Sequence, residues 1–78
     1  MQDKVRYVKA KIRNLLYYWD NDPRPRKNYS LVLRTIRKQL LEIVEKVEDE
    51  YLKKILEVID PKVNSKSQGE VIEKMKGI

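Results

Sequence analysis

Apolar residues recur every three or four positions between Asn28 and Asp60, in a stretch that contains neither proline nor glycine. This spacing places the apolar side chains along one face of an α-helix. The stripe consists of Tyr29, Leu33, Ile36, Leu40, Ile43 and Val47. We therefore predict a helix over residues 28–60, with Asn28 or Ser30 as its N-cap and the Asp60–Pro61 dipeptide at its end.

The apolar stripe shifts by one residue after Val47, because the next apolar positions are Tyr51 and Ile55. Such a shift either rotates the stripe around one continuous helix or marks a break near Glu48–Asp49. Strong helix formers dominate the junction. We therefore expect one long helix of about 50 Å, with the break as the alternative.

Two further amphipathic segments flank this helix. Residues 3–19 carry an apolar stripe at three- and four-residue spacing, and Asp3 is the expected N-cap. After a polar linker at 61–67, residues 68–76 form a shorter predicted helix. Ser67 and Glu70 fit a capping box at its start, and Gly77 fits a stop.

The predicted fold is all-α. It is a small helical bundle, and a single domain of residues 1–78, in which helices 3–19 and 68–76 fold against the long central helix. Nine residues are marginal as an isolated helix. We therefore expect the 68–76 segment to dock on the 51–59 half of the long helix, which helix 3–19 does not reach.

Basic residues are concentrated in the first half of the chain, although the net charge of the whole is +6. Residues 1–41 carry eleven bases against three acids, a net charge of +8, whereas residues 42–78 carry seven lysines against nine acids, a net charge of −2. All six arginines lie at or before Arg37. Guanidinium forks suit phosphates and carboxylates, so this asymmetry indicates an anionic partner for the first half.

Residues 20–28 form a predicted loop that contains two prolines and the run Pro-Arg-Pro-Arg-Lys. Its bases, Arg24, Arg26 and Lys27, project from a restricted backbone and can contact phosphates; the alternative is a solvated turn. The loop also contains Asp20-Asn21-Asp22. That run lacks the ligand spacing and glycine of a calcium-binding loop, so no metal site is predicted.

A second line of residues, on a flank of helix 3–19, alternates bases with aromatics. It consists of Lys4, Tyr7, Lys11, Asn14 and Tyr18. This composition suits stacking on nucleobases beside phosphate contacts. The alternative is that Tyr7 and Tyr18 widen the buried stripe while the lysines extend past them.

The composition disfavours an enzyme. The chain has no cysteine and no histidine, which removes the thiolate nucleophile and the usual general base. It has no glycine-rich phosphate loop and no pattern that predicts a cofactor. No apolar run is long enough to span a membrane. We expect a soluble, cytoplasmic, non-enzymatic protein, whose richness in Lys and Glu is typical of a thermophile.

Two functional hypotheses follow. In the first, the protein contacts nucleic acid with little sequence specificity through its Arg-rich half, as an accessory factor of a replication, repair or other nucleic-acid complex. In the second, it is an adaptor subunit whose basic half docks an acidic surface of a larger protein; a homodimer is a further option. The candidate binding residues are Arg24, Arg26, Lys27, Arg34, Arg37, Lys38, Lys4, Lys11, Tyr7 and Tyr18.

Overall fold

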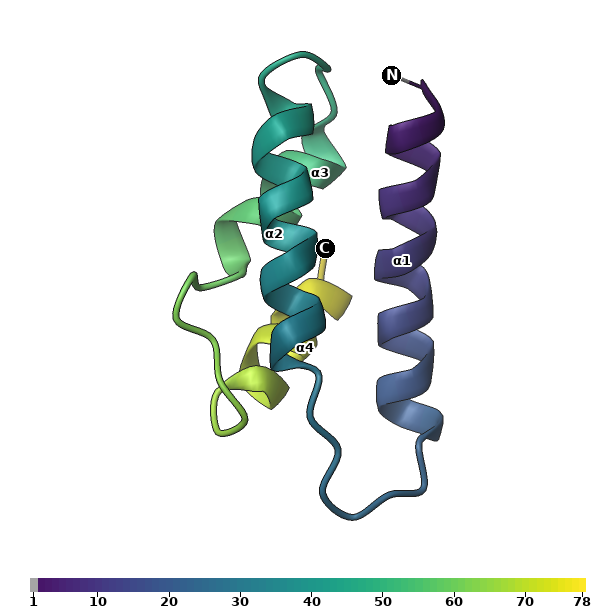
Figure 1. The fold of residues 1–78 in the computed structure, drawn as a ribbon, viewed down its shortest axis with the longest axis vertical. Helices are drawn as coiled ribbons and strands as arrows, with labels where there is room; N and C mark the ends of the chain where they lie inside the picture. The colour runs from purple at the N-terminus through teal and green to yellow at the C-terminus, as the bar shows by residue number, and fades with distance from the viewer. Residues whose placement is uncertain (1) are drawn as a thin grey trace.

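Four α-helices, α1 (Gln2–Asn21), α2 (Ser30–Val44), α3 (Glu50–Val58) and α4 (Gln68–Lys76), make up the fold in the computed structural model, which describes residues 2–78. No strand occurs among these residues. Successive helices run in alternating directions, and α1 lies antiparallel to α2 (Figure 1). The all-α bundle predicted from the sequence is confirmed. None of these helices is both long and apolar enough to cross a bilayer.

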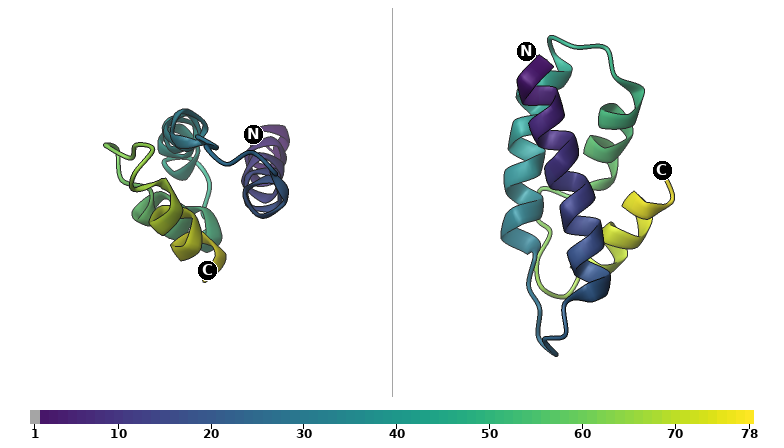
Figure 2. Two further views of the ribbon diagram at one scale, coloured as in Figure 1. Left: turned by 90° about the horizontal axis from the view of Figure 1, so that it is seen from below. Right: turned by 90° about the vertical axis from the view of Figure 1, so that its right-hand side faces the viewer.

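The helices form two layers. The antiparallel pair α1 and α2 makes one layer. The short helices α3 and α4 make the second layer and cover one face of this pair, one above the other (Figure 2). α4 contacts α3, so the predicted docking of residues 68–76 on the 51–59 segment is confirmed. The two short helices together cover a length that neither covers alone.

One hydrophobic core joins all four helices, and nearly all of its members are apolar positions of the predicted stripes; Val63, in the segment predicted as a polar linker, is an exception. Fully buried side chains come from every helix and from the α3–α4 linker. They include Val8, Ile12, Leu33, Ile36, Leu40, Leu52, Ile55, Ile59, Val63, Ile72 and Met75. Removing such apolar surface from water is the main stabilising term of a small fold.

The prediction of one continuous helix over 28–60 is wrong, and the break near Glu48–Asp49 is the correct alternative. α2 ends at Val44, and α3 begins at Glu50. Asp49 is the N-cap of α3, because its Oδ1 accepts a hydrogen bond from the Leu52 N–H at 3.1 Å. The Lys9 ammonium lies 2.7 Å from Asp49 Oδ2, which ties this cap to α1.

The break has a physical reason. A continuous helix would carry the apolar side chains of residues 51–59 beyond the reach of α1, whereas a reversal brings Leu52 and Ile55 into the common core. Aspartate is also a poor residue for a helix interior and a strong N-cap. The one-residue shift of the apolar stripe after Val47 therefore reflects this reversal of the chain.

The predicted N-caps of α1 and α2 differ in detail from the structure. α1 already includes Gln2, so Asp3 lies within its first turn rather than before it. α2 begins at Ser30, two residues later than predicted, and Asn28 Oδ1 accepts hydrogen bonds from the Ser30 backbone N–H and hydroxyl. Asn28 thus satisfies the N–H of the first residue of α2, while Tyr29 occupies the N-cap position without a side-chain capping hydrogen bond.

The capping box predicted at α4 is absent, although the helix begins at Gln68 and ends at Lys76 as predicted. The Ser67 hydroxyl makes no capping hydrogen bond. It instead accepts one from the Asn64 backbone N–H at 3.1 Å. A compact turn formed by Asn64 and Ser67 therefore replaces the predicted cap.

Candidate nucleic-acid interface

Few of the bases in the first half of the chain are neutralised by the fold. Of the eleven bases in residues 1–41, only Lys9 and Arg24 form ion pairs with carboxylates of the described residues 2–78. One of the few acids of this half, Asp20, is itself paired with Lys76 of α4 at 2.6 Å. The hydrogen bond to Asp20 raises the pKa of the Lys76 ammonium. The folded N-terminal half therefore keeps a large positive charge facing solvent.

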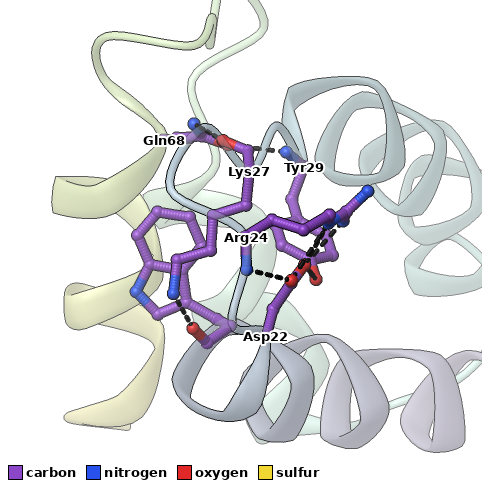
Figure 3. Close-up of polar contacts among 6 residues, drawn as sticks. Asp22, Arg24, Lys27, Tyr29 and Gln68 are labelled. Atoms are coloured by element: carbon purple, nitrogen blue, oxygen red, sulfur yellow. Dashed lines mark hydrogen bonds and ion pairs between the residues drawn. The ribbon is translucent and has the colours of Figure 1, made fainter.

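Arg24 is bound within the basic loop, which connects α1 to α2. Its Nε lies 2.9 and 3.0 Å from the two carboxylate oxygens of Asp22, and a second guanidinium nitrogen lies 2.5 Å from Oδ2. The Tyr29 hydroxyl donates to the same oxygen at 2.6 Å (Figure 3). These hydrogen bonds, first from Arg24 and then from Tyr29, hold the pKa of the Asp22 carboxyl well below its usual range.

Lys27 is also engaged within the fold. Its ammonium donates a hydrogen bond to the Trp19 carbonyl oxygen at the end of α1. The same nitrogen lies 4.6 Å from the centroid of the Trp19 ring, in a cation–π contact. Trp19 in turn packs edge-to-face on Tyr29, with ring centroids 5.9 Å apart.

A buried glutamine of α4 anchors the basic loop to the bundle. Gln68 is only 4% exposed. Its Oε1 accepts from the Tyr29 backbone N–H at 2.6 Å (Figure 3). Its Nε2 donates to the carbonyl oxygens of Lys27 at 2.9 Å and Ser65 at 3.0 Å. One amide thus fixes two segments that are about forty residues apart in sequence. A role for Gln68 could not be predicted from the sequence, since two of its partners are distant along the chain.

The three bases of the loop therefore differ in function. Arg24 and Lys27 stabilise the loop itself, and Arg26 is the exposed base without an ion pair or hydrogen bond within residues 2–78. Most residues of the loop are exposed, as in a solvated turn, but its conformation is held by Asp22, by the end of α1 at Trp19, by Tyr29 just before α2 and by Gln68 of α4. Its free charge is smaller than the sequence indicated.

The alternating line on α1 lies along its seam with α2. Lys4 and Tyr7 line one hollow of this seam, and Lys11, Asn14 and Tyr18 line a second. Tyr7 is 57% exposed and Tyr18 is 55% exposed. The interpretation in which these tyrosines widen the buried stripe is therefore wrong.

The bases of α2 lie on a different face from this seam. Val32 and Gln39 of α2 line the hollows. Arg34 follows Val32 by two residues and Arg37 precedes Gln39 by two, so each lies about 200° around the helix from a residue that lines a hollow. Lys38 is adjacent to Gln39 and lies about 100° around from it. The structure thus divides the predicted binding residues between the seam, the loop and α2. Arg34 and Lys38 are exposed on the outer face of α2, whereas Arg37 is partly buried and its Nε has no hydrogen-bond partner among the described residues.

The described part of the chain shows no arrangement of acids suited to a metal site. Within residues 2–78, no group of three or more acidic side chains is placed to hold a metal ion. The acids of the 20–22 run are occupied, Asp20 by Lys76 and Asp22 by Arg24. Comparison of the chain with protein-family models, curated proteins and solved structures found no significant match.

Proposed function

We propose that this protein is a non-enzymatic factor that binds nucleic acid through its basic N-terminal half with little dependence on base sequence. The observation that carries this proposal is the unneutralised charge of that half, in which nine of eleven bases have no carboxylate partner within residues 2–78. Clustered Lys and Arg side chains release the counterions of a phosphate backbone, which supplies affinity without base contacts.

The bases best suited to this role are those that the fold does not use. Arg26, Arg34 and Lys38 are exposed and form no ion pair or side-chain hydrogen bond within the described residues. Arg24 and Lys27 are unsuitable for a first test, because their substitution would also release the loop. The free bases therefore allow charge to be removed without disturbing the core.

The proposal is tested by fluorescence anisotropy with labelled DNA and RNA at about 50 and 200 mM salt. The triple variant Arg26→Gln, Arg34→Gln, Lys38→Gln should bind more weakly than wild type. Its plot of log affinity against log salt should be shallower by about 2 to 3, since each phosphate contact contributes about 0.7–0.9 to the slope. Circular dichroism should show unchanged helical content in the variant.

A matched control removes the same charge from the other half of the chain. Lys54, Lys62 and Lys66 are exposed and form no ion pair within residues 2–78, and their joint substitution by Gln should change affinity much less. Equal losses in the two triple variants would mean that net charge alone governs binding. Absence of binding at 50 mM salt would overturn the proposal.

The second candidate function is an adaptor that docks an acidic protein surface. It is supported by the outer face of α2, where Leu31 is 68% exposed and Leu41 is 42% exposed beside Arg34 and Lys38. Interfaces commonly combine an apolar centre with charged residues at the rim. Light scattering coupled to size exclusion tests self-association through this face, and Leu31→Lys should abolish any dimer that is found.

A further inference from the structure

Two hollows lie in line along the seam between α1 and α2. The first, of about 250 Å³, is lined by Lys4 and Tyr7 of α1 and by Gln39 and Glu42 of α2, among others. The second, of about 220 Å³, includes Tyr18 in its lining. The α1 residues that line both hollows follow one another at three- and four-residue spacing, so they share one face of the helix. We call the two hollows together the seam groove.

The tyrosines of the seam groove are not needed by the core. Each exposes more than half of its surface, while Val5, Val8, Ile12 and Leu15 supply the buried face of α1. Tyr7 and Tyr18 are eleven residues apart, which corresponds to about 16 Å along the helix axis. An aromatic ring at the surface offers an apolar face and a polar edge, a combination enriched at binding sites.

Positive charge accompanies both rings. The Lys11 ammonium lies 5.2 Å from the centroid of the Tyr7 ring. Neither Lys4 nor Lys11 has a carboxylate partner within residues 2–78. Glu42 is the single acid that lines either hollow, and it shares its hollow with Lys4. The seam groove thus combines aromatic rings with cations that no carboxylate of the described residues neutralises.

The first hollow also contains a hydrogen-bond acceptor that has no donor. Gln39 Oε1 is buried and has no hydrogen-bond donor among the described residues. A buried acceptor without a donor costs free energy. A ligand that donates a hydrogen bond to this oxygen would remove that cost.

We infer that the seam groove binds single-stranded nucleic acid, with unpaired bases stacked on Tyr7 and Tyr18 and the backbone phosphates held by Lys4 and Lys11. This inference rests on the proposed function and specifies its ligand. Stacking on aromatic side chains requires bases whose faces are free, and in a duplex those faces are covered by neighbouring base pairs. Every base has such a face, so the groove tolerates many sequences.

The test compares labelled single-stranded RNA and DNA of about twelve nucleotides with duplexes of the same sequence, by anisotropy at low salt. Wild type should prefer the single strands. Tyr7→Leu and Tyr18→Leu should each weaken single-strand binding by about tenfold, the loss typical of one stacked base, and should leave duplex binding unchanged. Comparing RNA with DNA shows which of the two the groove prefers.

Matched variants separate stacking from a change in the fold. Tyr51 on α3 is also at the surface, 36% exposed and outside the seam groove, so Tyr51→Leu should leave affinity unchanged. Tyr7→Phe and Tyr18→Phe keep the ring and should bind nearly as wild type. Lys4→Gln and Lys11→Gln should each lower the salt slope for single strands by about 0.7.

The outcomes distinguish this inference from the proposed function. Equal affinity for single strands and duplexes, with no effect of the tyrosine substitutions, would overturn the seam groove as a binding site and leave general polyanion binding intact. Parallel losses of single-strand and duplex binding in the Tyr→Leu variants would also overturn it. No binding to any nucleic acid would overturn both.

Discussion

Substitution of Gln68 by leucine tests whether one buried amide holds the basic loop in place. The change preserves most of the side-chain volume and removes three hydrogen bonds, to the carbonyls of Lys27 and Ser65 and from the N–H of Tyr29. The two carbonyls belong to loop segments and can rebind water in part. The Tyr29 N–H is partly buried at the start of α2, where water replaces Gln68 less well.

The expected loss of stability is about 2–3 kcal/mol. A typical intramolecular hydrogen bond contributes about 1 kcal/mol net, and a donor left buried without an acceptor costs somewhat more. The whole free energy of unfolding of a 78-residue chain is about 4–12 kcal/mol. The variant should therefore lose between about a sixth and about three quarters of its stability, with a fall in Tm of about 10–20 °C.

The assay is urea denaturation followed by circular dichroism, with amide hydrogen exchange at Tyr29 as a local readout. Gln39→Leu is the matched control, since the Oε1 of Gln39 already lacks a donor within residues 2–78. Its removal should be neutral or slightly stabilising. A Gln68→Leu variant within about 0.5 kcal/mol of Gln39→Leu, with unchanged exchange at Tyr29, would refute the anchoring role.

Three further predictions concern other polar contacts of the fold. Asp49→Ala removes a helix cap and the partner of Lys9, so unfolding by urea should show a loss of about 1–2 kcal/mol. Asp49→Asn should lose much less, and equal losses would argue against the cap. The free energy of unfolding should be flat from about pH 5 to pH 9, because the chain has no histidine. It should fall below about pH 4, since the hydrogen bond from Lys9 lowers the pKa of Asp49 and protonation removes that stabilisation. It should also fall above about pH 10, where Lys76, whose pKa is raised by its α1 carboxylate partner, loses its proton; a step between pH 6 and 7 in urea titrations would contradict this. Finally, Arg24→Gln should lower Tm while Arg26→Gln should not, and equal Tm values by differential scanning calorimetry would contradict the loop geometry.

Contacts that form only in the folded chain decided which of the predicted binding residues are exposed and unpaired. Exposure of Tyr7 and Tyr18 depends on how wide a face α2 covers on α1, which the α1 sequence does not specify. Arg24 is held by Asp22 of the same loop and Lys27 by the Trp19 carbonyl at the end of α1, and the composition of the loop did not indicate either contact. The composition of the loop predicted three available bases, and its geometry leaves Arg26 as the exposed one without an ion pair or hydrogen bond in the described chain.

The sequence by itself determined the helical class, the α1 and α4 segments to within two residues, and nearly the whole core, because amphipathic periodicity records burial locally. It also determined the charge asymmetry between the two halves. Only the tertiary structure decided that the chain reverses at 45–49, because the choice between a continuous helix and a capped break depends on whether residues 51–59 find an apolar partner elsewhere. The division of the basic residues between a fixed loop, the seam groove and the outer face of α2 has the same origin. Hydrogen bonds such as those of Gln68, about forty residues from its loop partners, exist only once the helices have packed.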